Sequence, residues 1–389
     1  KEDSAMHPRL SRRELAMLAA AGVVRAEPQP GVPYAGPLDG YQDKVDLKTF
    51  DPTAWGVSRY ANAKLRLTFR AKARKEAIAW QTRLRAKLIE LLGGFPKAAA
   101  APRGITLEVR EFPSYRREKF VFESRHGLTV LGYLITPKSG KAPYPAMIAV
   151  PGHGRGVDDI VGIDDKGQPR TDKAGYQHDF AIQAVEHGMA AVAIEPLGFG
   201  CRRDAAAKRN SLGTSSCQPS SGAAFLIGET MIGWRAYDVK RTIDWIETRK
   251  ELDPKRVGCM GISGGGTCTL FSAAVEPRIQ VAYVSGYLNT FRASIMSISH
   301  CIDNYVPGIL HWAEAYDVAG LIAPRALFVE SGEFDNIFPI AASRESFERV
   351  KKVYEVFGAA DKAEQEVFPG KHSFHGARGL PFAAKHLGV

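Results

Sequence analysis

A serine in a glycine-rich turn is the first residue whose setting points to chemistry. A short apolar run that begins near Arg256 ends in Gly261-Ile262-Ser263-Gly264-Gly265, and a stretch with the composition of a buried helix follows it. A strand that turns sharply into a helix at a Gly-x-Ser-x-Gly sequence presents the serine hydroxyl as a nucleophile. Side chains at Gly261 and Gly265 would collide with the backbone around such a turn. The backbone N–H of Gly264, at the start of the helix, is then free to face a developing oxyanion.

A serine nucleophile needs a base that takes its proton and an acid that orients the base. Both residue types follow Ser263 at the ends of later apolar strands. The strand 326–329 runs into a loop that contains Asp335, and the last strand runs into a turn that contains His372. Serine, acid and base in this chain order, at three strand ends, predict a Ser263–Asp335–His372 triad.

Other residues could take these roles. An aspartate before a helix is often an N-cap, and a histidine in a loop is often a solvated polar residue. His375 is the alternative base. Glu333 and Asp303 are the alternative acids.

The second oxyanion donor is expected in the turn Val150–Gly156, where glycines let the backbone approach a substrate. The N–H of His153 is the best candidate there. As an alternative, His153 could be the base or a metal ligand, although no spacing around it resembles a metal site. Asp158, Asp159, Asp164 and Asp165 do not fit the spacing of an EF-hand, so a solvated loop is expected instead.

Two arginines follow the second of the apolar strands. Arg202 and Arg203 lie in a loop that should neighbour the oxyanion turn, so they are possible substrate-binding residues. A guanidinium fork suits a carboxylate or paired sugar hydroxyls. The alternative is that both arginines pair with Asp158, Asp159 or Asp164 across the rim.

The elements around these residues predict an α/β fold. Apolar strands alternating with helices indicate a mostly parallel sheet with helices on both faces, and its ligands lie at the carboxyl ends of the strands. The expected strands are 146–150, 190–194, 256–260, 281–284, 326–329 and 364–368. Before them, 105–112 and 119–136 alternate like an antiparallel hairpin pair. Residues 155–178 and 199–228 are expected to form a loop rim or lid.

The helix predicted to end near Gly93 carries Trp80, Leu84 and Leu88 at helical spacing and should pack on the main body. We expect a catalytic domain over 101–389 and an N-terminal extension with this long helix over 27–100. Residues 1–26 are expected to combine a short vector-derived remnant with a twin-arginine export signal around Arg12 and Arg13. An ordinary short helix is the alternative for that segment.

The net charge of +10 is spread along the chain and mixed with acidic residues, which argues against a nucleic-acid partner. There is no run of 18 apolar residues that would span a membrane. The five cysteines are too few for a disulfide scaffold. In an exported protein, Cys201 with Cys217 and Cys268 with Cys301 are candidate bridges, and Cys259 is expected to be a buried apolar residue.

The serine turn, the Gly332–Pro339 loop, the Pro369–His372 turn and the Pro151–Gly154 turn together resemble the alpha/beta-hydrolase superfamily. Within it, the chain resembles exported bacterial acetyl xylan esterase-like and dienelactone hydrolase-like proteins. The resemblance implies ester hydrolysis through an acyl-enzyme by Ser263, Asp335 and His372, with no cofactor. One departure is the stretch Glu195–Gly200, where relatives commonly carry an Asp and an Arg before the glycines.

These observations predict a serine carboxylesterase whose substrate is a small-molecule or carbohydrate ester, with an acetyl ester of a sugar as the leading expectation. A lactone hydrolase and a serine peptidase are alternatives on the same fold. A binding protein that kept the fold without catalysis is the alternative of a different class.

Overall fold

The computed structural model describes residues 36–96 and 101–389. The expected export signal therefore lies outside the described residues. The chain divides into two compact units, Lys1–Gly56 and Val57–Val389. The described part of the first unit contains a short 3-10 helix, η1 (Leu47–Phe50), and helix α2 (Pro52–Ala61) begins there. The two units are divided after Gly56, so the long helix over Arg74–Leu91 belongs to the larger unit.

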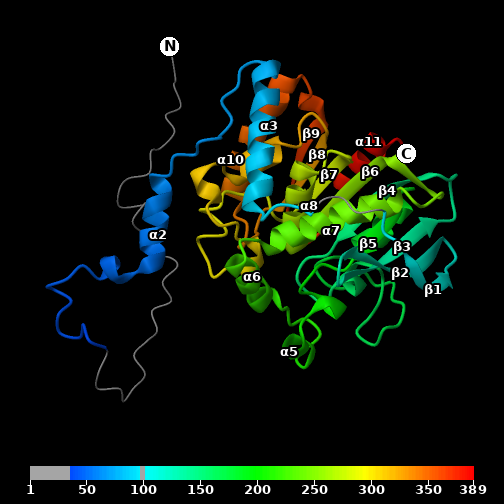
Figure 1. Cartoon of the computed structure of the whole chain (residues 1–389), viewed down its shortest axis with the longest axis horizontal. Helices are drawn as coiled ribbons and strands as arrows, with labels where there is room; N and C mark the ends of the chain where they lie inside the picture. The colour runs from blue at the N-terminus through cyan, green and yellow to red at the C-terminus, as the bar shows by residue number, and fades with distance from the viewer. Residues whose placement is uncertain (1–35, 97–100) are drawn as a thin grey trace, which may run out of the picture. The chain divides into compact units, whose positions relative to one another are not determined.

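A nine-stranded sheet forms the centre of the larger unit (Figure 1), with the order β1-β2-β3-β5-β4-β6-β7-β8-β9. From β5 to β9 the neighbouring strands are parallel, and β1, β2 and β3 add an antiparallel edge. This confirms the predicted mostly parallel sheet. The strands are β1 (Ile105–Glu111), β2 (Tyr115–Arg125), β3 (Leu128–Pro137), β4 (Tyr144–Val150), β5 (Ala190–Ile194), β6 (Leu252–Ile262), β7 (Ile279–Ser285), β8 (Ala326–Gly332) and β9 (Ala363–Phe368).

The antiparallel edge has three strands where the alternating pattern indicated two segments. The segment 119–136 contains a tight turn between β2 and β3, and Gly127 takes a φ of 77° there. A left-handed conformation favours glycine, so the turn interrupts a pattern that otherwise reads as one strand.

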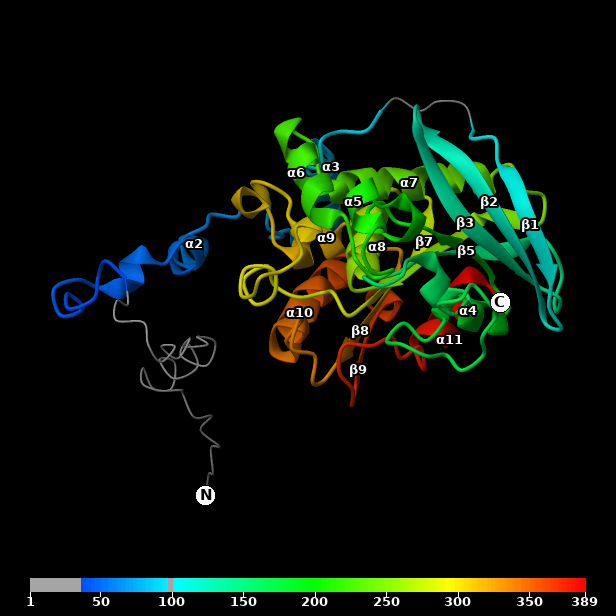
Figure 2. The same cartoon turned by 90° about the horizontal axis from the view of Figure 1, so that it is seen from below.

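Helices cover both faces of the sheet, as expected. On one face pack α3 (Arg74–Leu91), α7 (Met231–Ile246), α8 (Gly264–Val275), α9 (Ala315–Gly320) and α10 (Ile340–Phe357). On the other face pack α4 (Phe180–Glu186) and α11 (Gly379–Leu387), and Figure 2 shows them on the side of the sheet opposite α7 and α8. The short helices α5 (Ala205–Lys208) and α6 (Cys217–Leu226) lie in the long loop after β5.

The two larger hydrophobic cores follow from the alternation of side chains along the buried strands. In β4, Ile148 and Val150 belong to the core under α7 and α8, whereas Met147 and Ala149 belong to the core under α4 and α11. Successive side chains of a strand point to opposite faces, so a strand covered on both faces is apolar throughout.

Helix α3 is attached to the larger unit along its apolar stripe. Trp80, Leu84 and Leu88 are buried in the core beneath it, and the indole N–H of Trp80 donates to the Leu67 carbonyl at 2.7 Å. The helix stops where Gly93 takes a φ of 100°. The predicted packing of this helix on the main body is confirmed.

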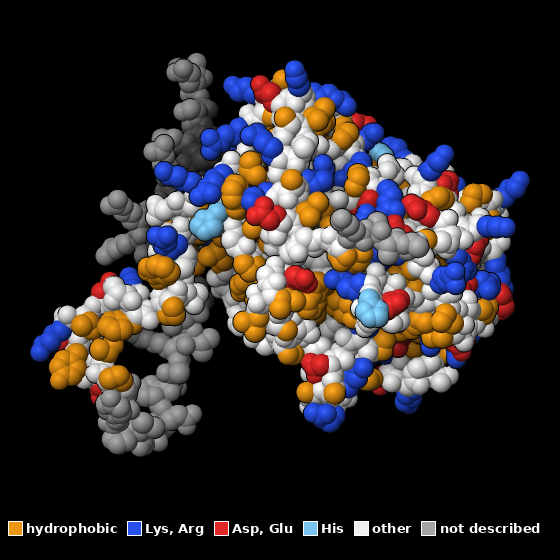
Figure 3. Space-filling model, in the orientation of Figure 1, with side chains coloured by type: hydrophobic (Ala, Val, Ile, Leu, Met, Phe, Trp, Pro, Cys, Tyr) orange, Lys and Arg blue, Asp and Glu red, His pale blue; other side chains and the backbone are white. Residues whose placement is uncertain are grey.

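The surface and the helices agree with two expectations from composition. On the face seen in Figure 3, Lys and Arg side chains are scattered and mixed with Asp and Glu. No helix within 36–96 or 101–389 has the length and apolar content that crossing a membrane would require.

Candidate active site

Ser263 occupies the sharp turn between β6 and α8. Its backbone has φ 58° and ψ −121°, a region that residues with a side chain rarely adopt. The strain is held in place by two backbone hydrogen bonds: Ser263 N donates to the Ser285 carbonyl at 3.1 Å, and Thr267 N donates to the Ser263 carbonyl at 2.8 Å. The neighbouring β7 and the first turn of α8 therefore fix the half-buried serine in this turn.

Close backbone packing explains the glycines on either side of the serine. A Cβ atom on Gly265 would lie 1.9 Å from the Val150 carbonyl oxygen, and one on Gly261 would lie 2.5 Å from the same oxygen. The end of β4 thus passes directly under the elbow. This contact places the turn after β4 beside Ser263.

Asp335 and His372 meet at the end of the sheet. His372 Nδ1 lies 2.6 Å from Asp335 Oδ2, and the Asp335 carboxylate is buried. The other oxygen, Oδ1, accepts hydrogen bonds from Ile337 N at 2.8 Å and Phe338 N at 3.0 Å. The aspartate is thus fixed by the first turn of its own loop, and the exposed Glu333 makes no such contact with His372.

The His372 ring lies against the elbow. A Cβ atom on Gly286, the residue after β7, would lie 3.0 Å from His372 Cε1 and 3.4 Å from Ile262 Cγ1. His372 and Ser263 line the same cavity of about 310 Å³. No described residue hydrogen-bonds His372 Nε2. The nitrogen that a serine hydroxyl would need is therefore unoccupied by protein groups.

The alternative base is engaged elsewhere. His375 Nδ1 lies 3.0 Å from Glu366 Oε1, and the His375 ring stacks on Phe368. His375 does not line the cavity with Ser263.

The two backbone N–H groups predicted as oxyanion donors lie in the turn after β4 and at the start of α8. Among the described residues, no group accepts a hydrogen bond from the backbone N–H of His153 or of Gly264. The turn is held from the loop 155–178: Tyr176 Oη donates to the His153 carbonyl at 2.7 Å, and Gly152 N donates to Gln177 Oε1 at 2.8 Å. Tyr176 and Gln177 are positioning residues that sequence analysis missed, since nothing in their local sequence marks them.

The imidazole of His153 belongs to a polar cluster next to the cavity. His153 Nε2 lies 3.1 Å from Cys301 Sγ, 3.6 Å from Cys217 Sγ and 3.6 Å from Asp303 Oδ2. Arg235 Nη1 donates to Asp303 Oδ2 at 2.6 Å. Burial alone would raise the pKa of Asp303, but the charge of Arg235 outweighs it and holds that pKa well below its usual range. Asp303, the other alternative acid, thus faces Arg235 and His153 and forms no hydrogen bond with His372.

The candidate disulfides are not formed. All five cysteines are free. Cys201 is exposed, whereas Cys217 is buried against His153 and Asp303, so their thiols point to different surroundings. Cys268 lies inside α8 against Ser272, whereas the Cys301 thiol lies beside His153. Cys259 is buried, as expected.

Arg202 and Arg203 turn inward and do not line the cavity. Arg202 Nη1 donates to Asp238 Oδ2 and to the Glu195 carbonyl, both at 2.8 Å. Arg203 donates to backbone carbonyls of its own loop, including those of Gly200 and Ser211. The alternative pairing with Asp158, Asp159 or Asp164 is wrong as well, because Arg202 pairs with Asp238 of α7 and Arg203 binds backbone carbonyls.

The acidic loop is held by internal contacts. Asp159 pairs with Arg155, and Asp164 Oδ1 accepts backbone N–H groups of its own turn. Asp158 Oδ1 accepts a hydrogen bond from the Tyr133 hydroxyl at 3.3 Å.

Glu330 is a third residue whose importance the sequence did not reveal. Its buried carboxylate accepts hydrogen bonds from Ser285 Oγ at 2.7 Å, Tyr283 Oη at 2.5 Å, and the backbone N–H groups of His375 and Gly376. Burial raises the pKa of this carboxyl. The residue joins β7, β8 and the loop that carries His372. A charged residue directly after the apolar run 326–329 was the available signal.

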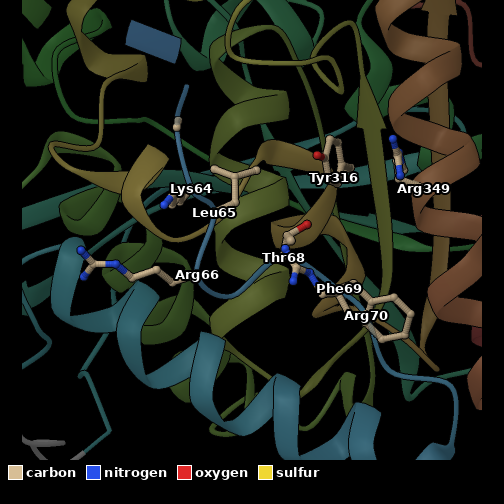
Figure 4. Close-up of a pocket in the computed structure, with 9 residues that line it drawn as sticks. Lys64, Leu65, Arg66, Thr68, Phe69, Arg70, Tyr316 and Arg349 are labelled. Atoms are coloured by element: carbon tan, nitrogen blue, oxygen red, sulfur yellow. The ribbon is translucent and has the colours of Figure 1, made fainter. Parts of the chain in front are cut away.

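A larger hollow of about 670 Å³ lies elsewhere on the same unit, between the segment that precedes α3 and the helices α9 and α10. Figure 4 shows two groups of lining residues. Tyr316 and Arg349 lie on the two helices, and the segment before α3 carries Lys64, Leu65, Arg66, Thr68, Phe69 and Arg70. The lining is basic and contains no serine, histidine or carboxylate. It therefore offers none of the groups that Ser263 and His372 provide.

Comparisons with known proteins agree with this fold. The chain is 26% identical over 286 residues to the Putative hydrolase YtaP of Bacillus subtilis (strain 168). The aligned region covers 71% of this chain and 89% of that protein. Its fold is similar to that of a putative acetyl xylan esterase from Bacteroides fragilis NCTC 9343, with a TM-score of 0.70, 19% identity and 82% of each chain covered. It is also similar to a glucuronoyl esterase from Solibacter usitatus, with a TM-score of 0.60, 16% identity, and 84% of this chain and 98% of that chain covered. Residues 56–375 match the model of the Abhydrolase family, so the chain belongs to this family of alpha/beta hydrolases.

Proposed function

We propose that the protein is a serine carboxylesterase in which Ser263, His372 and Asp335 form the catalytic triad. One observation carries the proposal. His372 is bound to a buried carboxylate through Nδ1, whereas its Nε2 has no partner among the described residues and the ring shares a cavity with a strained serine. A base that is oriented on one side and open on the other is what proton transfer from the serine requires.

Acylation follows from this arrangement. Ser263 Oγ attacks the ester carbonyl carbon while His372 Nε2 accepts the hydroxyl proton, and Asp335 stabilises the imidazolium that forms. The carbonyl oxygen becomes an oxyanion, which the N–H groups of Gly264 and His153 stabilise. When the C–O bond to the alcohol breaks, His372 returns the proton to the leaving alkoxide. The acid part of the ester remains on Ser263.

Deacylation repeats the steps with water. His372 Nε2 takes a proton from a water molecule that attacks the acyl-enzyme, and the second oxyanion occupies the same two N–H groups. The proton then passes to Ser263 Oγ as the carboxylic acid leaves. The cycle restores the enzyme and consumes one water per ester.

The cavity favours a small acyl group on a polar alcohol. Its volume of about 310 Å³ is at the low end for small-molecule sites. Its wall includes Ser299 and His300, and His300 Nε2 has no partner among the described residues. Burial lowers the pKa of His300, so a neutral imidazole faces the cavity and can bind a hydroxyl. These groups support a carbohydrate ester, and an acetyl ester in particular, as the substrate.

Active-site labelling tests the proposal. A fluorophosphonate should label the parent protein on Ser263 and should not label Ser263→Ala. The parent should hydrolyse p-nitrophenyl acetate faster than longer-chain esters, and it should deacetylate acetylated sugars. A folded parent protein that neither reacts with the probe nor hydrolyses any of these esters would contradict the proposal.

A further inference from the structure

A four-residue cluster beside the serine cavity has the donor set of a metal centre. We propose that His153, Cys217, Cys301 and Asp303 form a closed tetrahedral Zn²⁺ site. This inference rests on the cluster alone and does not depend on the proposed esterase activity. The sequence indicated only His153 as an alternative metal ligand, because the four ligands come from three distant segments and lack a motif spacing.

The distances between the donor atoms fit one ion. Zn²⁺ binds thiolate sulfur at about 2.3 Å and histidine nitrogen or carboxylate oxygen at about 2.0–2.2 Å, so the edges of its tetrahedron measure about 3.3–3.8 Å. His153 Nε2 lies 3.1 Å from Cys301 Sγ and 3.6 Å from Asp303 Oδ2, and Cys217 Sγ lies 3.3 Å from the same carboxylate oxygen. All four donor atoms lie within 4.8 Å of one another. Small adjustments of the side chains would bring them onto one tetrahedron.

The surrounding charges balance when the ion is bound. Two thiolates and one carboxylate oppose Zn²⁺ and the Arg235 guanidinium, so the buried set is neutral. Arg235 Nη1 donates to Asp303 Oδ2 and Asn304 Nδ2 donates to Asp303 Oδ1 at 2.8 Å, so partners outside the ligand set hold the carboxylate in place. Such outer partners are typical of metal ligands in proteins.

The site would join three loops around the serine. His153 lies in the turn after β4, Cys217 begins α6, and Cys301 and Asp303 flank the start of a short 3-10 helix, η4 (Ile302–Asn304). Four protein ligands leave no open position, so the ion has a structural role. By binding Nε2 of His153, it would fix the turn that carries the proposed oxyanion donor.

The competing use of the two thiols is a disulfide between Cys217 and Cys301. It would consume both sulfur ligands and remove two hydrogens from the chain. A disulfide and a zinc site therefore give opposite results in metal content and in free-thiol count.

Cobalt binding tests the inference on the full chain. The parent, stripped of metal by a chelator in the presence of a reductant, is titrated with Co²⁺ and then with Zn²⁺. Thiolate ligation gives charge-transfer absorption in the near ultraviolet, and tetrahedral geometry gives intense visible bands. We expect about one Co²⁺ per chain, displaced by Zn²⁺.

Cys217→Ser and Cys301→Ser should each weaken binding by at least about 10-fold and reduce the charge-transfer band. Cys201→Ser, an exposed thiol outside the cluster, should behave like the parent.

Metal analysis of the untreated parent completes the test. We expect Zn²⁺ to copurify and all five thiols to react with a thiol reagent after unfolding in the presence of a chelator. A parent that binds no Co²⁺ when reduced, or one isolated with a Cys217–Cys301 disulfide, would overturn the inference. So would Co²⁺ binding that Cys201→Ser impairs as strongly as Cys217→Ser and Cys301→Ser do.

Discussion

His372 Nδ1 and Asp335 Oδ2 are 2.6 Å apart, and the other carboxylate oxygen of Asp335 accepts two backbone N–H groups of its own loop. The backbone of the loop thus holds the carboxylate in place, and the carboxylate in turn orients the imidazole. With Nδ1 donating to Asp335, the basic lone pair of the neutral ring lies on Nε2, the nitrogen without a protein partner among the described residues. The relationship determines which nitrogen can act as the base.

Asp335→Asn should therefore lower kcat by about 10⁴-fold while the protein stays folded, because the amide can donate to Nδ1 and favour the wrong tautomer. Steady-state hydrolysis of p-nitrophenyl acetate measures the loss. Glu333→Gln is the matched control, since Glu333 lies in the same loop but is exposed. If Glu333→Gln caused the large loss and Asp335→Asn did not, Asp335 would not be the acid.

Ser263→Ala should abolish ester hydrolysis and retain the fold, since it removes only the hydroxyl from the elbow. Ser263→Gly should also be inactive but should unfold at a higher denaturant concentration than Ser263→Ala, because glycine adopts a φ of 58° without strain. Urea unfolding of the two inactive variants gives the comparison. Equal stability would show that the elbow stores little strain, and residual activity in both variants would exclude Ser263 as the nucleophile.

His372→Ala should be about as damaging to kcat as Ser263→Ala, because members of a triad act as one unit. His375→Ala should keep activity within a few-fold of the parent, since the ring of His375 pairs with Glu366 outside the cavity. Hydrolysis rates of the two variants on one ester decide between the histidines. The reverse order would make His375 the base.

Arg202→Ala should destabilise the protein by about 3–5 kcal/mol, because it leaves the buried Asp238 carboxylate without its partner. The double variant Arg202→Met/Asp238→Leu should lose much less, since it removes both charges. Urea unfolding measures these changes. In folded Arg202→Ala, the ratio of kcat/KM on an acetylated sugar to that on p-nitrophenyl acetate should match the parent. A selective loss on the sugar would return Arg202 to the substrate site.

Local patterns predicted the parts of the site that short segments determine. The Ser263 turn, the Asp335 loop and the His372 turn each follow an apolar strand, and parallel strands bring their carboxyl ends to one edge. This rule placed the Asp335 loop near the His372 turn. Which carboxylate and which histidine would pair was left open until the structure showed the contact between Asp335 and His372.

Partners across distant segments could not be predicted in the same way. Arg202 pairs with Asp238 and Arg235 with Asp303, and each pair joins a helix to a loop. The sequence showed the charged residues themselves. Which carboxylate an arginine pairs with depends on which helix packs beneath the loop, and the sequence did not show that. The same reason hid the approach of Cys217 to Cys301, and it led to incorrect candidate disulfides.

The carboxyl group of Glu195 is buried between two glycine turns. A Cβ atom on Gly156 would lie 2.1 Å from Glu195 Oε1, and one on Gly200 would lie 2.0 Å from Oε2. Val157 N donates to Oε1 at 3.0 Å. Burial raises the pKa of Glu195 to about 8, so the group is protonated at neutral pH in the folded protein.

Stability should therefore fall as the pH rises toward 8. Above a pH of about 4.5 the unfolded chain releases the proton of Glu195, while the folded protein keeps it up to a pH of about 8. Folding then takes up a proton, so this group lowers the free energy of unfolding by up to about 1.4 kcal/mol per pH unit in that window. Below and above the window, the group does not change how the free energy of unfolding depends on pH.

Glu195→Gln cannot ionise, so its free energy of unfolding should change less between pH 6 and 8 than that of the parent, whatever its stability at pH 6. Urea unfolding at both values gives the slopes, with the exposed Glu345→Gln as control. If the slopes of the parent and Glu195→Gln were equal, Glu195 would be ionised in the folded protein at pH 6.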